Sequence, residues 1–98
     1  MTLTKDPEKN ETKHLHNIVD FKGKRVLEIG CGEGRLTWRY ASASFSTIGL
    51  DPDKDLLRIA SIDRPSDMDN KIHFANAEAE HIPFSKETFD IAILAWSL

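Results

Sequence analysis

The sequence predicts one α/β domain built on a parallel sheet of about four strands with flanking helices. Strand-forming segments alternate with segments of helical spacing, which is typical of parallel strands joined by right-handed crossovers. A glycine-rich turn follows the first strand directly. The 98 residues suffice for one hydrophobic core but not for two domains.

The first part of the chain predicts a lead-in, a short helix and a buried strand. Residues 1–12 are polar and charged and are expected to be a flexible lead-in, with the domain proper at 13–98. Apolar spacing predicts a helix up to Val19, which a turn containing Gly23 ends. Residues 25–29 are nearly all strand formers, so we expect a strand covered on both faces.

Two helices and a second strand are expected next. The first helix should run from residue 33 or 34 to about 43, with Leu36, Tyr40 and Ala43 buried. Residues 47–50 should form a strand that ends at Asp51. Asp53 can cap the second helix, whose expected buried residues are Leu56, Leu57, Ile59 and Ala60.

The last third predicts two more strands. Residues 62–70 contain proline, serine and three aspartates and are expected to be a loop. Residues 71–75 predict a short edge strand, and residues 85–88 predict a turn. Residues 89–96 are apolar and predict a fourth strand of the buried kind.

Composition narrows the classes of partner and compartment. Residues 26–98 carry seven basic and twelve acidic side chains, and such a surface would repel a phosphate backbone, so no nucleic-acid partner is expected. Cys31 is the only cysteine, which excludes an internal disulfide and favours a reducing, cytoplasmic setting. The longest apolar run, 91–96, is too short to span a bilayer, so no membrane partner is expected.

The turn after the first strand carries the main functional signal. Gly30, Gly32 and Gly34 let the backbone turn sharply and approach a ligand. Glu28 precedes them at the carboxyl end of the strand, where burying a carboxylate costs several kcal/mol unless a cation or a donor meets it. The pattern therefore predicts a ligand with a positive group near Glu28.

Glycine spacing separates the ligand classes. No segment has the spacing of a phosphate-binding P-loop. A dinucleotide fold would need glycine at position 35, where Arg35 stands, so a nicotinamide-dependent oxidoreductase is disfavoured. Asp51 follows Gly30 by 21 residues, close to the spacing of an acid that binds ribose hydroxyls at the end of the second strand.

The motifs, in this order, resemble those of the class I S-adenosylmethionine-dependent methyltransferases, especially small domains that act on small molecules. Residues 26–34 look like the first motif of that family and residues 48–51 like its second-strand signature. Residues 72–84 resemble its third-strand segment, and 89–91 open a fourth strand in the same way. The resemblance implies a Rossmann-like fold, S-adenosylmethionine as cofactor, and methyl transfer to a small-molecule acceptor.

The resemblance also implies roles for single residues. Gly30, Cys31 and Gly32 would approach the methionine portion of the cofactor, and Glu28 would lie near its amino group. Asp51 would accept both ribose hydroxyls, and it could also cap a helix, a role compatible with the first. The remaining implied contacts are those of Glu78 with the adenine amino group, the Ala79 N–H with the ring, and the Ala95 carbonyl with the methionine amino group.

Other roles remain open at this stage. Asn76 could take the adenine role in another register, and Glu78 and Glu80 could be solvated charges. Tyr40 is expected to be a packing residue and Asp90 a structural one. No catalytic residue is identified, His81 being only a candidate general base, and no metal is required.

The complete sheet of this family has seven strands, in the order 3-2-1-4-5-7-6, and the chain supplies the first four. The predicted fold is therefore a truncated methyltransferase fold, the amino-terminal half. The fourth strand would be an exposed apolar edge, which predicts possible self-association. The alternative function is a non-catalytic cofactor-binding or dimerising module.

Overall fold

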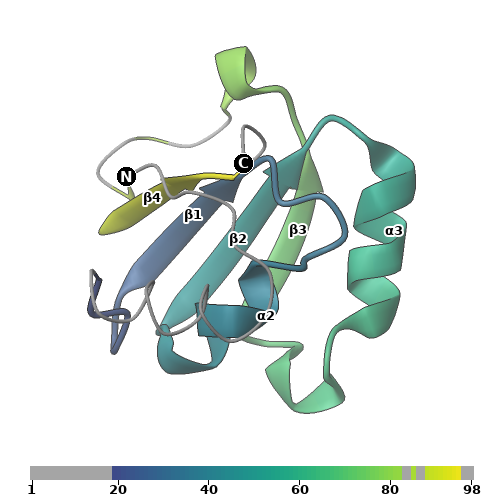
Figure 1. The fold of residues 1–98 in the computed structure, drawn as a ribbon. Coiled ribbons are helices and arrows are strands. Elements are labelled where there is room, and N and C mark those ends of the chain that lie inside the picture. The colour runs from purple at the N-terminus through teal and green to yellow at the C-terminus, as the bar shows by residue number, and fades with distance from the viewer. Residues whose placement is uncertain (1–18, 83–84, 86–87, 96–98) are drawn as a thin grey trace.

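The computed structural model describes residues 19–82, 85 and 88–95 and contains one parallel sheet. Its strands are β1 (Arg25–Ile29), β2 (Ser46–Asp51), β3 (Ile72–Asn76) and β4 (Ile91–Leu94). They lie in the order β3-β2-β1-β4, and all three pairs are parallel (Figure 1). The predicted fold class and strand order are confirmed.

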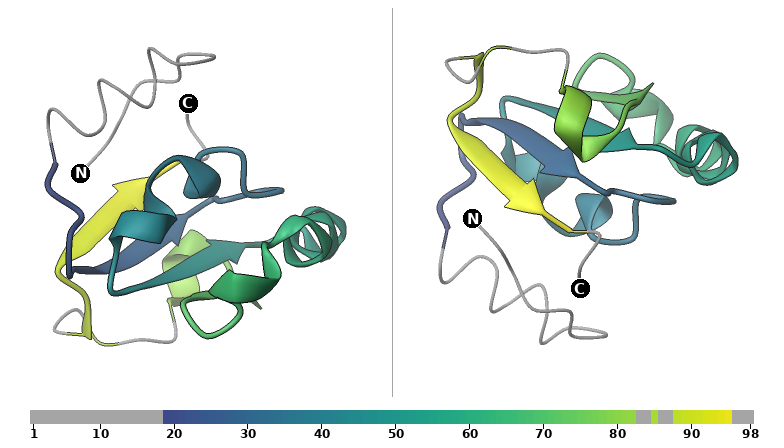
Figure 2. Two further views of the ribbon diagram at one scale, coloured as in Figure 1. Left: turned by 90° about the horizontal axis from the view of Figure 1, so that it is seen from below. Right: turned by 90° about the horizontal axis from the view of Figure 1, so that it is seen from above.

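Strand β1 is central, and its two faces contact different parts of the core. Val26 packs with the residues around Tyr40, whereas Leu27 and Ile29 pack with Leu50 in a separate cluster. Helix α2 (Thr37–Tyr40) lies on one face of the sheet and the short 3-10 helix η3 (Ala79–His81) on the other (Figure 2). Side chains alternate along a strand, so Glu28 shares a face with Val26 and points toward α2.

The first helix begins later than predicted. The chain turns through the glycine loop as far as Leu36, and α2 is followed at once by the 3-10 helix η1 (Ala41–Ala43). The positive φ of Gly34, 89°, is incompatible with a helix beginning at 33 or 34. The backbone leaves helical geometry at Tyr40, whose φ is -132°, so the buried stripe of α2 does not continue into η1. Ala41 is buried and Ala43 is exposed, contrary to the prediction.

The second helix, α3 (Lys54–Asp63), follows the predicted cap. The Asp53 side chain accepts hydrogen bonds from the backbone N–H groups of residues 55 and 56. Leu57 and Ala60, three residues apart, face the core, whereas Ile59 lies on another side of the helix and is 42% exposed, so its predicted burial was wrong. The predicted loop at 62–70 also proves partly helical, since α3 reaches 63 and a 3-10 helix, η2 (Ser66–Met68), follows.

The last two strands differ from prediction, β3 in its position along the chain and β4 in its length. Strand β3 lies at the sheet edge, as predicted, one residue later in the chain. Strand β4 is shorter than predicted and only Ile93 is fully buried in it, because β4 lies at the other edge, and Ala92 is exposed. The Thr88 N–H donates a backbone hydrogen bond of 3.1 Å to the Ser85 carbonyl, and the middle of the turn predicted at 85–88 lies outside the described residues.

Some predictions fall outside the described residues. They are the lead-in at 1–12, the helix before Val19, the end of the 72–84 segment at 83–84, and residue 96 of the predicted fourth strand. Val19 and Phe21 are described and are buried, and Gly23 turns the chain with a φ of 71°. Within the described part of the chain, no helix combines the length and apolar character needed to cross a membrane.

Candidate functional site

The glycine loop is fixed to the carboxyl end of β2. The Leu50 carbonyl accepts hydrogen bonds from the N–H groups of Gly30, at 2.7 Å, and Cys31, at 3.0 Å. Gly30 and Gly32 have φ values of 81° and 58°, a region that residues with a Cβ rarely adopt. The loop is therefore a compact turn that lies at the carboxyl ends of β1 and β2.

Cys31 packs beneath this loop against Gly49 of β2. A Cβ on Gly49 would lie 2.8 Å from the Cys31 Sγ and 2.9 Å from Phe74, so only glycine fits there without displacement. Burial, together with the nearby Glu28 and Asp51 carboxylates, raises the pKa of the Cys31 thiol far above its usual value. The thiol stays protonated and acts as a small packing group rather than as a nucleophile.

Glu28 is completely buried at the end of β1. Its Oε1 accepts hydrogen bonds from the Thr37 hydroxyl and the Tyr40 hydroxyl, each at 2.7 Å. These two hydroxyls are donors of the kind that a buried carboxylate requires. Tyr40 is a packing residue, as predicted, but its hydrogen bond to Glu28 was not predicted. The sequence signal for it is that Thr37 and Tyr40 are three residues apart, a spacing that places two side chains on the same face of a helix.

Asp51 joins the loop to the start of α3. It is 7% exposed, its Oδ2 accepts from the Gly32 N–H at 2.9 Å, and its Oδ1 accepts from the Asp53 N–H at 2.8 Å. The helix cap is Asp53, so the prediction that Asp51 could also cap the helix is wrong. Each Asp51 oxygen retains a further lone pair for a ligand hydroxyl.

Two cavities meet at Gly30 and Asp51. The first has a volume of about 440 Å³ and brings together six residues implied by the family resemblance: Glu28, Gly30, Cys31, Gly32, Asp51 and Ala95. It is also lined by Glu33, Arg35, Leu36 and Leu56, which were not predicted. Three acids against one base make its wall negative, and this favours a ligand that carries positive charge.

The second cavity, of about 470 Å³, shares Gly30 and Asp51 with the first. Glu78 lines it together with Pro52, Ala77 and Glu80. Asn76 is not among its described lining residues, and the Asn76 side-chain amide donates to the Asp51 carbonyl at 2.9 Å. The geometry therefore favours Glu78 over Asn76 as the polar group that faces this cavity, while Ala79 is the first residue of η3.

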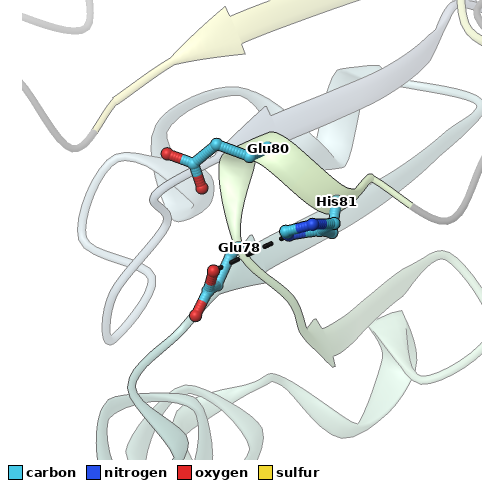
Figure 3. A group of neighbouring side chains, drawn as sticks. All are labelled: Glu78, Glu80 and His81. Carbon is cyan, nitrogen blue, oxygen red and sulfur yellow. Dashed lines mark ion pairs between the residues drawn. The ribbon is translucent and has the colours of Figure 1, made fainter.

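Glu78, Glu80 and His81 form an exposed group at this end of the sheet (Figure 3). Their potential ligand atoms lie within 4.8 Å of one another, and the His81 Nδ1 lies 3.7 Å from a Glu78 oxygen. The residue types suit a divalent cation, but solvent-exposed groups of this kind often carry none, and we assign no metal here. High exposure keeps these charges well solvated.

Asp90 lies away from both cavities, at the start of β4. Its carboxylate accepts from the Arg25 backbone N–H at 2.9 Å and from the Arg25 guanidinium, and its own N–H donates to the Arg25 carbonyl. These bonds join the beginnings of β1 and β4. Asp90 is a structural residue, as predicted.

Comparison with known proteins places these features in context. The sequence profile of a family described as "Methyltransferase domain" matches residues 26–98. A demethylmenaquinone methyltransferase of Lactococcus lactis is 28% identical over 89 residues, which cover 88% of this chain and 35% of that protein. A tRNA U34 carboxymethyltransferase of Pseudomonas savastanoi is 54% identical over 35 residues, which cover 35% of this chain and 11% of that protein.

A solved structure shows the same arrangement of strands and helices. A SAM-dependent methyltransferase from Methanosarcina mazei superposes with a TM-score of 0.67 and 26% identity, covering 85% of this chain and 42% of that one. The match to the Lactococcus lactis relative covers most of this chain but only about a third of the length of that relative.

Proposed function

Because the chain belongs to the family of S-adenosylmethionine-dependent methyltransferases, we propose that residues 13–98 are the cofactor-binding half of such an enzyme and hold S-adenosylmethionine across both cavities. One observation carries this proposal. The Glu28 cavity, Asp51 and the Glu78 cavity follow one another in space, with Gly30 and Asp51 shared. This is the order of an amino acid, a ribose and an adenine in the cofactor.

The chemistry of each position suits the part of the cofactor assigned to it. Glu28 offers a buried negative charge to the α-amino group, and the Ala95 carbonyl is a second acceptor at the same cavity. Asp51 offers carboxylate lone pairs to the ribose hydroxyls. Glu78 and the Ala79 N–H supply an acceptor and a donor for the adenine edge.

When bound, S-adenosylmethionine supplies an electrophilic methyl group on a sulfonium. The contribution of this chain would be to position and partly desolvate that group. We propose a small-molecule acceptor, which the acidic surplus of residues 26–98 supports over a nucleic acid, and a cytoplasmic setting, which the single cysteine supports. The similarity to a tRNA U34 carboxymethyltransferase makes RNA the competing class of acceptor. If mixed tRNA were retained on a filter by this protein in a saturable way, RNA would be favoured.

Calorimetric titration with S-adenosylhomocysteine and with NAD tests the cofactor assignment. The chain should bind S-adenosylhomocysteine and not NAD. Asp51→Asn should weaken binding by about tenfold or more, the loss of a charged hydrogen-bond partner. Asp55→Asn, the same change at an exposed position of α3, is the matched control and should bind like the wild type. Binding of NAD alone would refute the proposal.

A second candidate function is self-association through β4. In the described sheet this strand is an edge that pairs with β1 alone, and Ala92 is exposed on it. Sheet edges that carry exposed apolar side chains are sites of association. Sedimentation velocity over a range of concentrations should show a dimer that Ala92→Lys abolishes; a monomer at every concentration would exclude this candidate.

A further inference from the structure

Thr37 and Tyr40 hold the Glu28 carboxylate, and the proposed cofactor contacts assign no role to either of them. Glu28, Thr37 and Tyr40 are each 0% exposed. Both hydroxyls converge on the same oxygen, Oε1, at 2.7 Å, the short distance of a charge-assisted O–H bond. The carboxylate therefore has a defined orientation and a source of stabilisation independent of any ligand.

The geometry of α2 explains why the two donors meet. Thr37 and Tyr40 are the first and last residues of α2, and residues three apart lie on the same face of a helical turn. The Tyr40 ring is stacked on Phe21 with centroids 4.6 Å apart, which restricts the position of its hydroxyl. The donors are thus fixed by helix geometry and by packing.

The protonation of Tyr40 is consistent with its being the donor. Burial, and then the negative charge of Glu28, raise the pKa of the Tyr40 phenol well above its usual value. The phenol therefore keeps its proton at physiological pH. Donation from two neutral hydroxyls favours the charged form of Glu28, which burial alone would disfavour.

We propose that Thr37 and Tyr40 are positioning residues that keep Glu28 oriented and ionised, so that the first cavity selects ligands with an α-amino group. The inference rests on the proposed function, because Glu28 is the assigned partner of that group. Without the two hydroxyls, the buried carboxylate would lose two hydrogen bonds that orient it and favour its charged form. Discrimination between ligands with and without the amino group would then fall.

The test compares S-adenosylhomocysteine with its analogue in which hydrogen replaces the α-amino group. In the wild-type chain the amino ligand should bind at least about tenfold more tightly, the equivalent of one charged hydrogen bond. Thr37→Val and Tyr40→Phe should each reduce this ratio by about threefold or more. Thr37→Ser restores a hydroxyl and should restore the ratio.

Thr47→Val is the matched control for Thr37→Val. Thr47 is also 0% exposed, but its hydroxyl pairs with Ser44 at 2.8 Å instead of with Glu28. This variant loses a buried hydroxyl without touching the carboxylate, so its binding ratio should match the wild type. Tyr40→Phe keeps the ring stacked on Phe21 and provides the test should Thr37→Val fold poorly.

The outcomes separate the two proposals. An unchanged ratio in folded Thr37→Val and Tyr40→Phe would overturn the positioning role and leave the cofactor assignment intact. An equal loss of the ratio in Thr47→Val would also overturn it, since the effect would then belong to the core in general. A wild-type chain that binds neither ligand would overturn the proposed function and this inference with it.

Discussion

The acidic residues Glu28 and Glu78, which line the first and the second cavity, differ in their surroundings. At the end of β1, Glu28 is fully buried and bonded to two hydroxyls at 2.7 Å. Beyond β3, Glu78 is exposed and its carboxylate lies 3.7 Å from His81, itself exposed. The first carboxylate is oriented before a ligand arrives, whereas the second is solvated and must be ordered on binding. The two carboxylates should therefore contribute unequally to the affinity for the cofactor, Glu28 more than Glu78.

The largest expected effect is that of Glu28→Gln. The change keeps the shape and removes the charge, so S-adenosylhomocysteine should bind at least about thirtyfold more weakly, the equivalent of about 2 kcal/mol for a buried charge pair. Because a buried charge is costly, the free energy of unfolding should stay equal or rise. Calorimetry and urea titration measure the two quantities, and unchanged affinity would remove the distinction between the two carboxylates.

A smaller effect on cofactor binding is expected from a change in the packing beneath the glycine loop. In Gly49→Ala the new Cβ would lie 2.8 Å from the Cys31 Sγ and 2.9 Å from Phe74. The overpacking should lower the free energy of unfolding by about 1–3 kcal/mol. It should also weaken cofactor binding, because Cys31 belongs to the loop that lines the first cavity. A stable variant with normal affinity would show that the loop adapts more freely than the contacts indicate.

Glu78→Gln is the matched change at the exposed carboxylate. Because exposed charges are screened and pairs between them contribute at most about 1 kcal/mol, affinity should fall by no more than about fivefold. The same calorimetric titration measures it. A loss as large as that of Glu28→Gln would show that Glu78 becomes buried in the complex, and the comparison would then need revision.

The smallest effect concerns Asp90, which is partly exposed but ordered by its partner. Hydrogen bonds from the Arg25 side chain and backbone lower the pKa of the Asp90 carboxyl below its usual value of 3.8. The folded state thus binds fewer protons than the unfolded state, and stability is present above pH 3.8 and lost as pH falls through the lowered pKa. In urea titrations at pH 3–6, Asp90→Asn should be slightly less stable, with a difference that shrinks toward the acid end. A constant difference would contradict this linkage.

The sequence was sufficient for features encoded locally. The apolar run of β1, the glycine loop and Asp51 follow one another within a short stretch. Alternating strand and helix segments predicted the parallel sheet, and the family resemblance of the motifs implied six of the residues that line the first cavity. The cap at Asp53 was predicted for the same reason. The roles of these residues toward the cofactor remain proposals.

Features set by the tertiary environment were not predictable in this way. The late start of α2 follows from the left-handed conformation of Gly34, which apolar spacing does not reveal. The bonds of Thr37 and Tyr40 to Glu28 join a helix to a strand, and the exposure of Ile59 depends on which side of α3 meets the sheet. In each case the sequence predicted the kind of element but not its contacts.

One measurement tests the central claim that both cavities hold a single ligand with Asp51 between them. In a ¹⁵N–¹H correlation titration with S-adenosylhomocysteine, the amide signals of Gly30 and Gly32 at the first cavity and of Ala77 and Glu78 at the second should shift together. All four should fit one dissociation constant. Shifts confined to one cavity, or two separate dissociation constants, would contradict the claim.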